Sequence, residues 1–141
     1  MKKITLVLSA MIIGSTMVHA QSYTEVVWTQ IQNAFESASD DGYSMKNYII
    51  GAINEDEDNT WTFYFNRGTD YFIRGFCDED CNDLDIYLHD MDGDELDSDV
   101  EDDDFPLIYF SPYSSGRYHI EVSMYACEVE PCYWGLAIFE K

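Results

Sequence analysis

Acidic side chains are the groups in this sequence whose number and grouping could do chemistry, because 28 Asp and Glu residues stand against only 7 Lys and Arg residues. Half of them gather in four short runs, at residues 54–59, 78–83, 101–104 and 128–130. Carboxylates held a few ångströms apart repel by about 1 kcal/mol or more per pair, and a hard divalent cation removes that cost. In an exported protein, calcium is the cation that such a pattern favours.

The four runs are expected to meet if the chain folds into antiparallel strands. Such strands cross the domain and reverse, so alternate loops fall at the same end. A calcium site is therefore predicted at that end, with a loop near Cys77 stiffened by a disulfide and a second loop limited by Pro106. An acidic pole that only favours solubility is the alternative interpretation. The predicted calcium ligands are Asp78, Asp80, Asp83, Asp102, Asp103 and Asp104.

A second segment carries acids at the spacing of an EF-hand calcium loop. If Asp90 is position one, Glu95 stands at position six, where that loop needs glycine. The flanking residues also alternate as strands do, so the segment is interpreted as a β-hairpin turn at Asp92-Gly93. The residues on the EF-hand ligand positions are Asp90, Asp92, Asp94, Leu96, Ser98 and Glu101.

Four cysteines, Cys77, Cys81, Cys127 and Cys132, follow an export signal. An even number of cysteines in an exported chain predicts disulfides, here two. A zinc site is disfavoured, since three and four intervening residues fit a zinc ribbon poorly. Of the three possible pairings, the local one is favoured, which joins Cys77 to Cys81 and Cys127 to Cys132.

The sequence offers little for catalysis. His89 and His119 are the histidines beyond the signal, and neither has a nucleophile motif or a metal-ligand partner at helical spacing. A carboxylate pair for hydrolysis is the enzymatic alternative among so many acids, but their abundance does not identify a pair. The protein is therefore predicted not to be an enzyme.

The first 20 residues have the features of a secretory signal peptide. Lys2 and Lys3 precede an apolar stretch at residues 4–18, and Val18-His19-Ala20 suits signal peptidase. Cleavage after Ala20 would leave five basic residues against 28 acidic ones, a net charge of −23. The mature protein is expected in the periplasm or secreted, without membrane insertion, and this charge excludes nucleic-acid binding through a basic surface.

Hydrophobic periodicity then defines the elements. Residues 21–42 are predicted to hold one α-helix, from about Tyr23 to Ala38, with Ser22 and Glu25 as its capping box. Residues 43–141 alternate between apolar and polar side chains in several short runs. This pattern predicts an all-β fold, an antiparallel, jelly-roll-like β-sandwich with one N-terminal helix.

Two sets of side chains are assigned to faces of that sandwich. Trp134, Leu136 and Ile138 alternate along the last strand and should point inward. Four outward aromatic residues should pack beneath the helix, or else form a binding strip for sugars or peptides. These four are Tyr64, Phe72, Phe76 and Tyr87.

The run from about residue 59 to residue 140 resembles the bacterial pre-peptidase C-terminal domain. The resemblance is carried by residues 69–73, by Asp83-Leu84-Asp85-Ile86-Tyr87-Leu88 with Asp92-Gly93, and by residues 115–122 before an aromatic-rich last strand. It implies a small β-sandwich that accompanies secreted peptidases. The chain departs from that pattern because no peptidase domain precedes the sandwich.

Three functions follow from these observations. The main expectation is an exported, non-catalytic binding or accessory module that calcium stabilises, with an unidentified protein or glycan as its partner. The alternatives are a small exported hydrolase with a carboxylate pair and an acidic inhibitor or mimic that docks on a basic partner protein.

Overall fold

A computed structural model describes residues 17–141 as one helix and eight strands. The signal-peptide prediction concerns residues 1–20 and therefore lies largely outside the described residues. In chain order the elements are α1 (Met17–Asp40), β1 (Ser44–Ile53), β2 (Glu57–Phe65), β3 (Tyr71–Cys77), β4 (Cys81–His89), β5 (Glu95–Asp99), β6 (Leu107–Phe110), β7 (Gly116–Cys127) and β8 (Cys132–Glu140).

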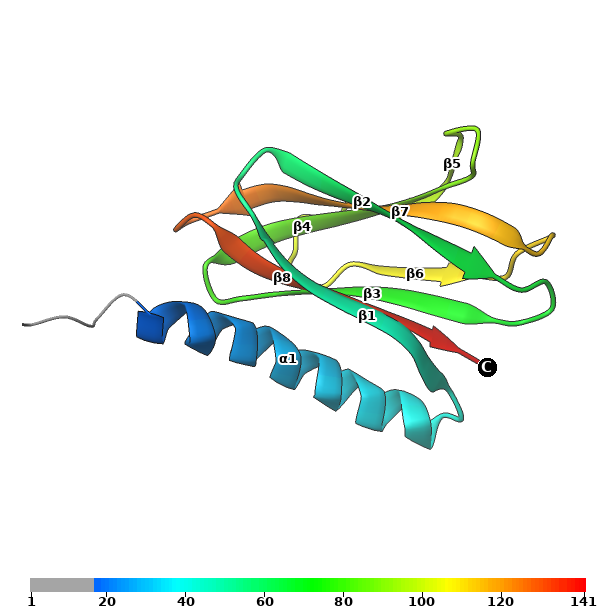
Figure 1. The fold of residues 1–141 in the computed structure, drawn as a ribbon, viewed down its shortest axis with the longest axis horizontal. Helices are drawn as coiled ribbons and strands as arrows, with labels where there is room; N and C mark the ends of the chain where they lie inside the picture. Colours follow the sequence, from blue (N-terminus) through cyan, green and yellow to red (C-terminus); the bar gives the residue numbers. More distant parts are fainter. Residues whose placement is uncertain (1–16) are drawn as a thin grey trace, which may run out of the picture.

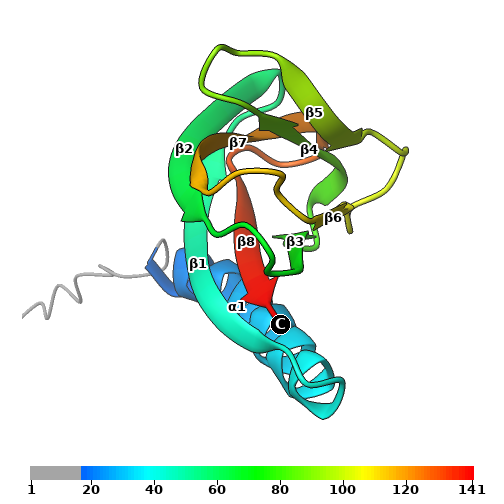
Figure 2. The same cartoon turned by 90° about the vertical axis from the view of Figure 1, so that its right-hand side faces the viewer.

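The strands form two four-stranded antiparallel sheets that face each other (Figures 1 and 2). One sheet has the order β1-β8-β3-β6, which we call the helix-side sheet, and the other has the order β2-β7-β4-β5, which we call the open sheet. Consecutive strands mostly alternate between the two sheets, so that the connections cross from one layer to the other. This architecture confirms the predicted β-sandwich with one N-terminal helix.

The main core lies between the sheets and is built by the alternating apolar side chains of the inner strands. Trp134, Leu136 and Ile138 are at most 1% exposed, as the alternation along the last strand predicts. They meet inward residues of β4 and β7, among them Leu84 and Val122, which are fully buried. Period-two patterning therefore correctly assigned the inner face of the sandwich.

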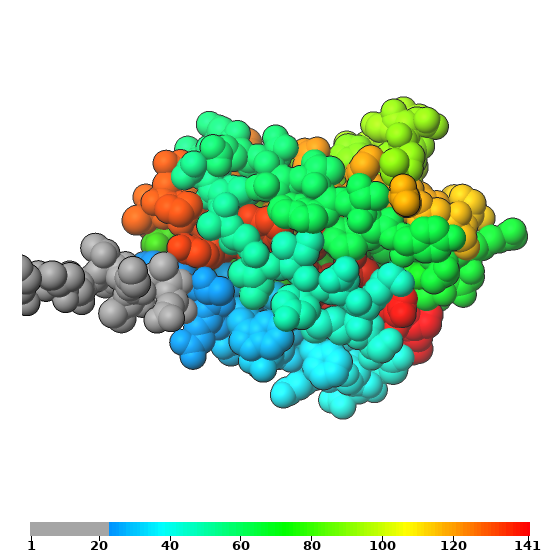
Figure 3. All heavy atoms as spheres, in the orientation of Figure 1, coloured from blue at the N-terminus to red at the C-terminus, as the bar shows by residue number. Residues whose placement is uncertain are grey.

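Helix α1 buries a second, smaller core against the outer face of the helix-side sheet. Val27 and Ile31 are fully buried there, together with Ala137 and Phe139 of β8. The helix approaches closely because β8 carries Gly135, where a Cβ would lie 2.7 Å from a methyl carbon of Val27. Strand β8 is thus buried on both faces, and the helix and β1 form a continuous surface (Figure 3).

The helix differs from its predicted start. It begins at Met17, so Ser22 lies inside it, and the capping-box interpretation of Ser22 and Glu25 is wrong. The spacing matched a cap, but helical backbone continues through it. The helix ends at Asp40 and is followed by Gly42 with a positive φ of 83°, which favours glycine.

The hairpin interpretation of residues 90–94 is confirmed. This turn joins β4 to β5 and protrudes from the body of the molecule (Figure 3). Gly93 adopts a φ of 90°, and the Asp90 carboxylate accepts hydrogen bonds from the backbone N–H groups of Asp92 and Asp94.

Across residues 17–141, no helix has the length and apolar character needed to span a membrane.

Candidate functional site

The four acidic runs meet at one end of the sandwich, which we call the acidic end. The β1–β2, β3–β4 and β7–β8 turns lie there side by side (Figure 1). Hydrogen bonds join them: the Glu55 backbone N–H donates to the Glu130 carboxylate, and the Glu128 backbone N–H donates to the Asp80 carbonyl. The β5–β6 loop reaches the same end, where the Asp103 carbonyl accepts from the Leu84 N–H. The predicted alternation of loops therefore holds.

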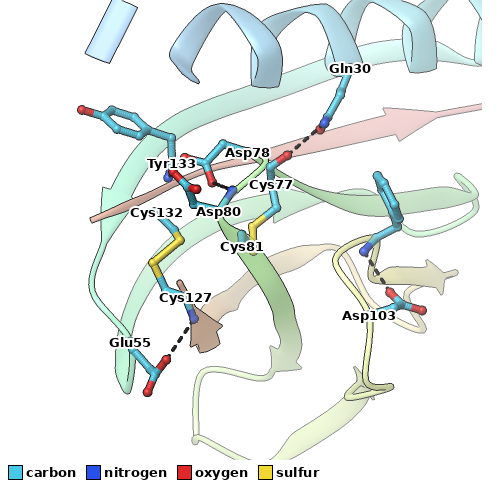
Figure 4. Close-up of a disulfide and its surroundings, with 11 residues drawn as sticks. Gln30, Glu55, Cys77, Asp78, Asp80, Cys81, Asp103, Cys127, Cys132 and Tyr133 are labelled. Carbon is cyan, nitrogen blue, oxygen red and sulfur yellow. Dashed lines mark hydrogen bonds between the residues drawn. A yellow bond between two sulfur atoms is a disulfide. The ribbon is translucent and has the colours of Figure 1, made fainter. Parts of the chain in front are cut away.

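Two disulfides fasten this end of the molecule (Figure 4). They join Cys77 to Cys81 and Cys127 to Cys132, which confirms the local pairing. The two bridges are neighbours, because Cys81 on β4 lies opposite Cys127 on β7. Each bridge closes a tight turn between two sheets, so the acidic loops are held in place by covalent links.

Asp78 has a structural role in the turn after β3 (Figure 4). Its side chain is buried, and its carboxylate accepts hydrogen bonds from the backbone N–H groups of Tyr133, at 2.7 Å, and Asp80, at 3.2 Å. Burial raises the pKa of this carboxyl, and the two N–H donors partly offset that effect. One oxygen of Asp78 therefore joins the β3–β4 turn to β8, and the other holds the turn itself together.

The six predicted calcium ligands fall into two places. Asp78 and Asp80 lie beside β8 and Tyr23, whereas Asp83 and Asp102 line a pocket at the edge of the open sheet. Asp103 accepts a hydrogen bond from the Phe105 N–H at 2.8 Å, and burial raises the pKa of Asp104. Within residues 17–141, no three acidic, His or Cys side chains are grouped closely enough to hold a metal ion. Calcium binding stays a prediction, which melting in calcium chloride against sodium chloride of equal ionic strength would test.

A pocket at the edge of the open sheet is lined by three acidic side chains. It has a volume of about 430 Å³ and is lined by Asp83 and Asp85 of β4, Val100 and Asp102 of the β5–β6 loop, and Tyr125 of β7. We call it the acidic pocket. Asp83 and Asp85 are each only 7% exposed. The pocket therefore places two nearly buried carboxylates beside an exposed one.

Electrostatics in the acidic pocket are repulsive. The pKa of Asp83 is raised by burial and by the neighbouring carboxylates of Asp85, Asp102 and Asp103. Burial also raises the pKa of Asp85, although the Tyr87 hydroxyl donates to its carboxylate at 3.2 Å. Sequence analysis missed Asp85 as a site residue, and the available signal was its alternation with Leu84 and Ile86, which places it beside Asp83 on the outer face.

The outer face of the open sheet carries the remaining polar groups. The His89 imidazole lies 3.8 Å from the Glu121 carboxylate, and the His119 ring is hydrogen-bonded to the Thr62 hydroxyl at 2.9 Å.

The prediction that four outward aromatics lie under the helix is half wrong. Phe72 and Phe76 pack with the helix, but Tyr64 and Tyr87 belong to β2 and β4 of the other sheet.

A second pocket lies between the edges of the two sheets, away from the acidic end. Its volume is about 460 Å³, and its walls include Leu96 and Asp97 of β5 and Tyr109 of β6. Tyr113 lines it as well and is 96% exposed, while Tyr109 is 68% exposed. We call it the tyrosine pocket. Exposed tyrosines of this kind are typical of binding surfaces for proteins and sugars.

The carboxyls with raised pKa values predict an unusual pH dependence. Asp78, Asp83, Asp85 and Asp104 have raised pKa values in the folded protein, so the folded state binds protons more tightly than the unfolded chain does. Stability should therefore rise as the pH falls from 7 toward the ordinary Asp value of 3.8. Melting temperatures at constant ionic strength between pH 7 and about pH 4.5 would measure this. A steady fall over that range would contradict it; the lowered pKa of Glu57 acts in that opposite direction.

The class of protein that these features define is a two-sheet antiparallel β-sandwich with one covering helix and two disulfides at its acidic end. No protein-family model matches the chain, and no curated protein matches it in sequence. The resemblance to the pre-peptidase C-terminal domain therefore stays a prediction.

Among solved structures, the chain is similar to the crystal structure of Aeromonas hydrophila PliG, a periplasmic lysozyme inhibitor of g-type lysozyme. The TM-score is 0.51 at 13% sequence identity, and the match covers 67% of this chain and 85% of that chain. At this level of identity the likeness concerns the fold.

Proposed function

We propose that the mature protein acts outside the cytoplasm as a non-catalytic inhibitor that binds a positively charged enzyme, with a lysozyme as the first candidate. The observation that carries this proposal is the uncompensated negative charge of the mature protein, which has 28 acidic residues and, without Lys2 and Lys3, five basic ones. Half of the acidic residues stand in the four runs that meet at the acidic end. The likeness of the fold to a periplasmic lysozyme inhibitor supplies the class of partner to try first.

The cations of the described chain do little to neutralise the acidic end. Lys46 pairs with Glu140 near the opposite end of β8, and Arg74 lies over the Phe76 ring beneath the helix. Lys141 donates to the Asp41 carbonyl and lies over Tyr43. Arg67 follows the end of β2 and Arg117 stands at the start of β7, both at the end of the sandwich opposite the acidic end. A basic partner would therefore meet a surface of one sign, which accelerates encounter and selects against acidic proteins.

The disulfides support a binding role that needs a fixed surface. The acidic loops are joined by main-chain hydrogen bonds and two covalent links, so little ordering is needed when a partner binds. A preorganised surface loses less conformational entropy on association and binds more tightly for the same contacts. Local disulfides also agree with an oxidising compartment.

A lysis assay tests the proposal. The mature protein is incubated with a g-type lysozyme and with lysozymes of other types, and the clearing of a peptidoglycan suspension is followed. Inhibition of at least one basic lysozyme is expected, with a rate of association that falls as sodium chloride is raised, because exposed charges are screened. Unchanged lysis by every enzyme at a large excess of the protein would contradict the proposal.

Two matched variants locate the surface. The first neutralises four exposed acids at the acidic end, and the second neutralises four exposed acids elsewhere. The first should raise the inhibition constant at least tenfold and the second less than threefold; equal effects would mean that only total charge matters. The first variant is Glu79→Gln, Glu101→Gln, Asp102→Asn and Glu128→Gln, and the second is Glu36→Gln, Asp40→Asn, Asp92→Asn and Asp94→Asn.

A glycan or peptide-binding accessory role is the second candidate, and the tyrosine pocket favours it. Tyr113 and Tyr109 expose most of their rings around a volume of about 460 Å³. Aromatic rings of this kind stack on sugar faces and on extended peptides. Calorimetric titration with cell-wall oligosaccharides, repeated with Tyr109→Ala, separates this role from inhibition of a basic protein.

A further inference from the structure

Asp83 is a buried carboxylate whose Oδ1 atom lacks a partner. Asp83 is only 7% exposed, and its Oδ1 atom accepts no hydrogen bond. A buried charged oxygen without a donor is destabilising, so most such atoms in folded proteins are satisfied. Asp83 also lines the acidic pocket. Asp83 is therefore a destabilising carboxylate in the wall of the acidic pocket.

The charges around Asp83 all have the same sign. The groups whose charge acts on it are the carboxylates of Asp85, Asp102 and Asp103. Asp85 has one hydrogen bond, from the Tyr87 hydroxyl, while Asp102 is exposed at the mouth. An incoming cation would thus gain attraction from several carboxylates and remove their mutual repulsion.

The rest of the acidic pocket fits an organic cation better than a metal ion. Val100 is 55% exposed and Tyr125 is 66% exposed, so each offers apolar surface to a side-chain stem or a flat cation. The face of a tyrosine ring attracts a guanidinium group. A metal ion needs several closely grouped ligands, and none of the described acids form such a group.

We propose that the acidic pocket formed by Asp83, Asp85, Val100, Asp102 and Tyr125 is a socket for an arginine side chain of the partner protein. The guanidinium group donates to the carboxylates of Asp83 and Asp85. Its stem lies against Val100, and its plane lies against the Tyr125 ring. Arginine fits because its fork of N–H donors serves two carboxylates at once. This inference rests on the proposed function only in taking the partner to be a protein.

A peptide titration tests the socket without any lysozyme. Isotope-labelled mature protein is titrated with the end-blocked tripeptide Gly-Arg-Gly and, as an uncharged match, with the same peptide carrying citrulline. Saturable amide shifts at the five pocket residues are expected with arginine and not with citrulline. Asp83→Asn should weaken arginine binding at least tenfold, and the protein should melt at a higher temperature because an unpaired buried charge is gone. Asp102→Asn, in the exposed loop, provides a second weakened variant if Asp83→Asn does not fold.

The control variant is Asp92→Asn, which removes the same charge from the protruding β4–β5 turn. It should leave the dissociation constant within twofold. Equal weakening by Asp92→Asn and Asp83→Asn, or shifts spread over all acidic loops, would overturn the socket in favour of a diffuse acidic surface. Displacement of the peptide by calcium but not by sodium chloride of equal ionic strength would overturn it in favour of a metal site. If the pocket binds the arginine peptide but the protein inhibits no lysozyme, the lysozyme proposal is rejected and the arginine socket stands.

Discussion

Replacing Trp134 by alanine is expected to lower the free energy of unfolding by about 3 to 5 kcal/mol. The indole is fully buried between the sheets, and its ring centroid lies 5.1 Å from that of Trp61. It also fills the space above Gly51, where a Cβ would lie 2.9 Å from the indole. Truncation leaves a large cavity bounded by both sheets, which the β-sandwich cannot close without moving a strand. Urea denaturation followed by circular dichroism measures the effect.

Two further variants make the result specific to packing. Tyr113→Ala removes an aromatic side chain that is 96% exposed, and it should change stability by less than about 0.5 kcal/mol. Trp134→Phe should cost less than alanine, because it keeps much of the volume and removes an indole N–H that is buried without a partner. A Trp134→Ala protein as stable as the parent would mean that this face of β8 is not in the core.

Removing both disulfides is expected to cost about 4 kcal/mol, from two short loops that contribute about 2 kcal/mol each by constraining the unfolded chain. Replacing Cys77, Cys81, Cys127 and Cys132 by alanine avoids placing polar groups at sites that are at most 8% exposed. The two bridges lie opposite each other, so their effects need not add. Each double variant removes one bridge, and the quadruple variant removes both. Urea denaturation of these variants measures the loss in the free energy of unfolding for each bridge alone and for the two together.

A reducing agent provides the control for this experiment. It should destabilise the parent and leave the quadruple alanine variant unchanged, since that variant has no bridge to break. Peptide mapping of the parent should recover the Cys77–Cys81 and Cys127–Cys132 links. A quadruple variant within about 1 kcal/mol of the parent would show that packing and hydrogen bonds alone hold the acidic loops.

The features that the sequence could predict are those set by local periodicity and short spacing. Alternation along residues 132–140 identified Trp134, Leu136 and Ile138 as inward, because side chains of a strand point to opposite faces whatever the strand pairs with. The local disulfides could likewise be predicted from the sequence, since a separation of four or five residues matches a tight turn. The meeting of the acidic loops followed from antiparallel reversal.

The sequence did not predict in the same way which of the two sheets each strand joins. Tyr64 and Tyr87 have the same alternation as Phe72, yet they lie on the open sheet, because their strands pair with β7 and not with β8. Pairing partners are chosen by contacts between distant residues, which a single sequence does not encode locally. The prediction that all four aromatics lie beneath the helix therefore failed for two of them.

The sequence by itself determined that this chain is an acidic, disulfide-linked β-sandwich with one helix, since charge, cysteine spacing and hydrophobic period are properties of the residues alone. Only the tertiary structure decided which carboxylates are neighbours. It separated Asp78, whose oxygens accept from the main chain, from Asp83, whose Oδ1 remains unpartnered in a pocket, although both stand in one acidic run. The physical reason is that burial and hydrogen bonding depend on elements that pack over a residue from elsewhere in the chain: β8 over Asp78, and Tyr125 with the β5–β6 loop beside Asp83.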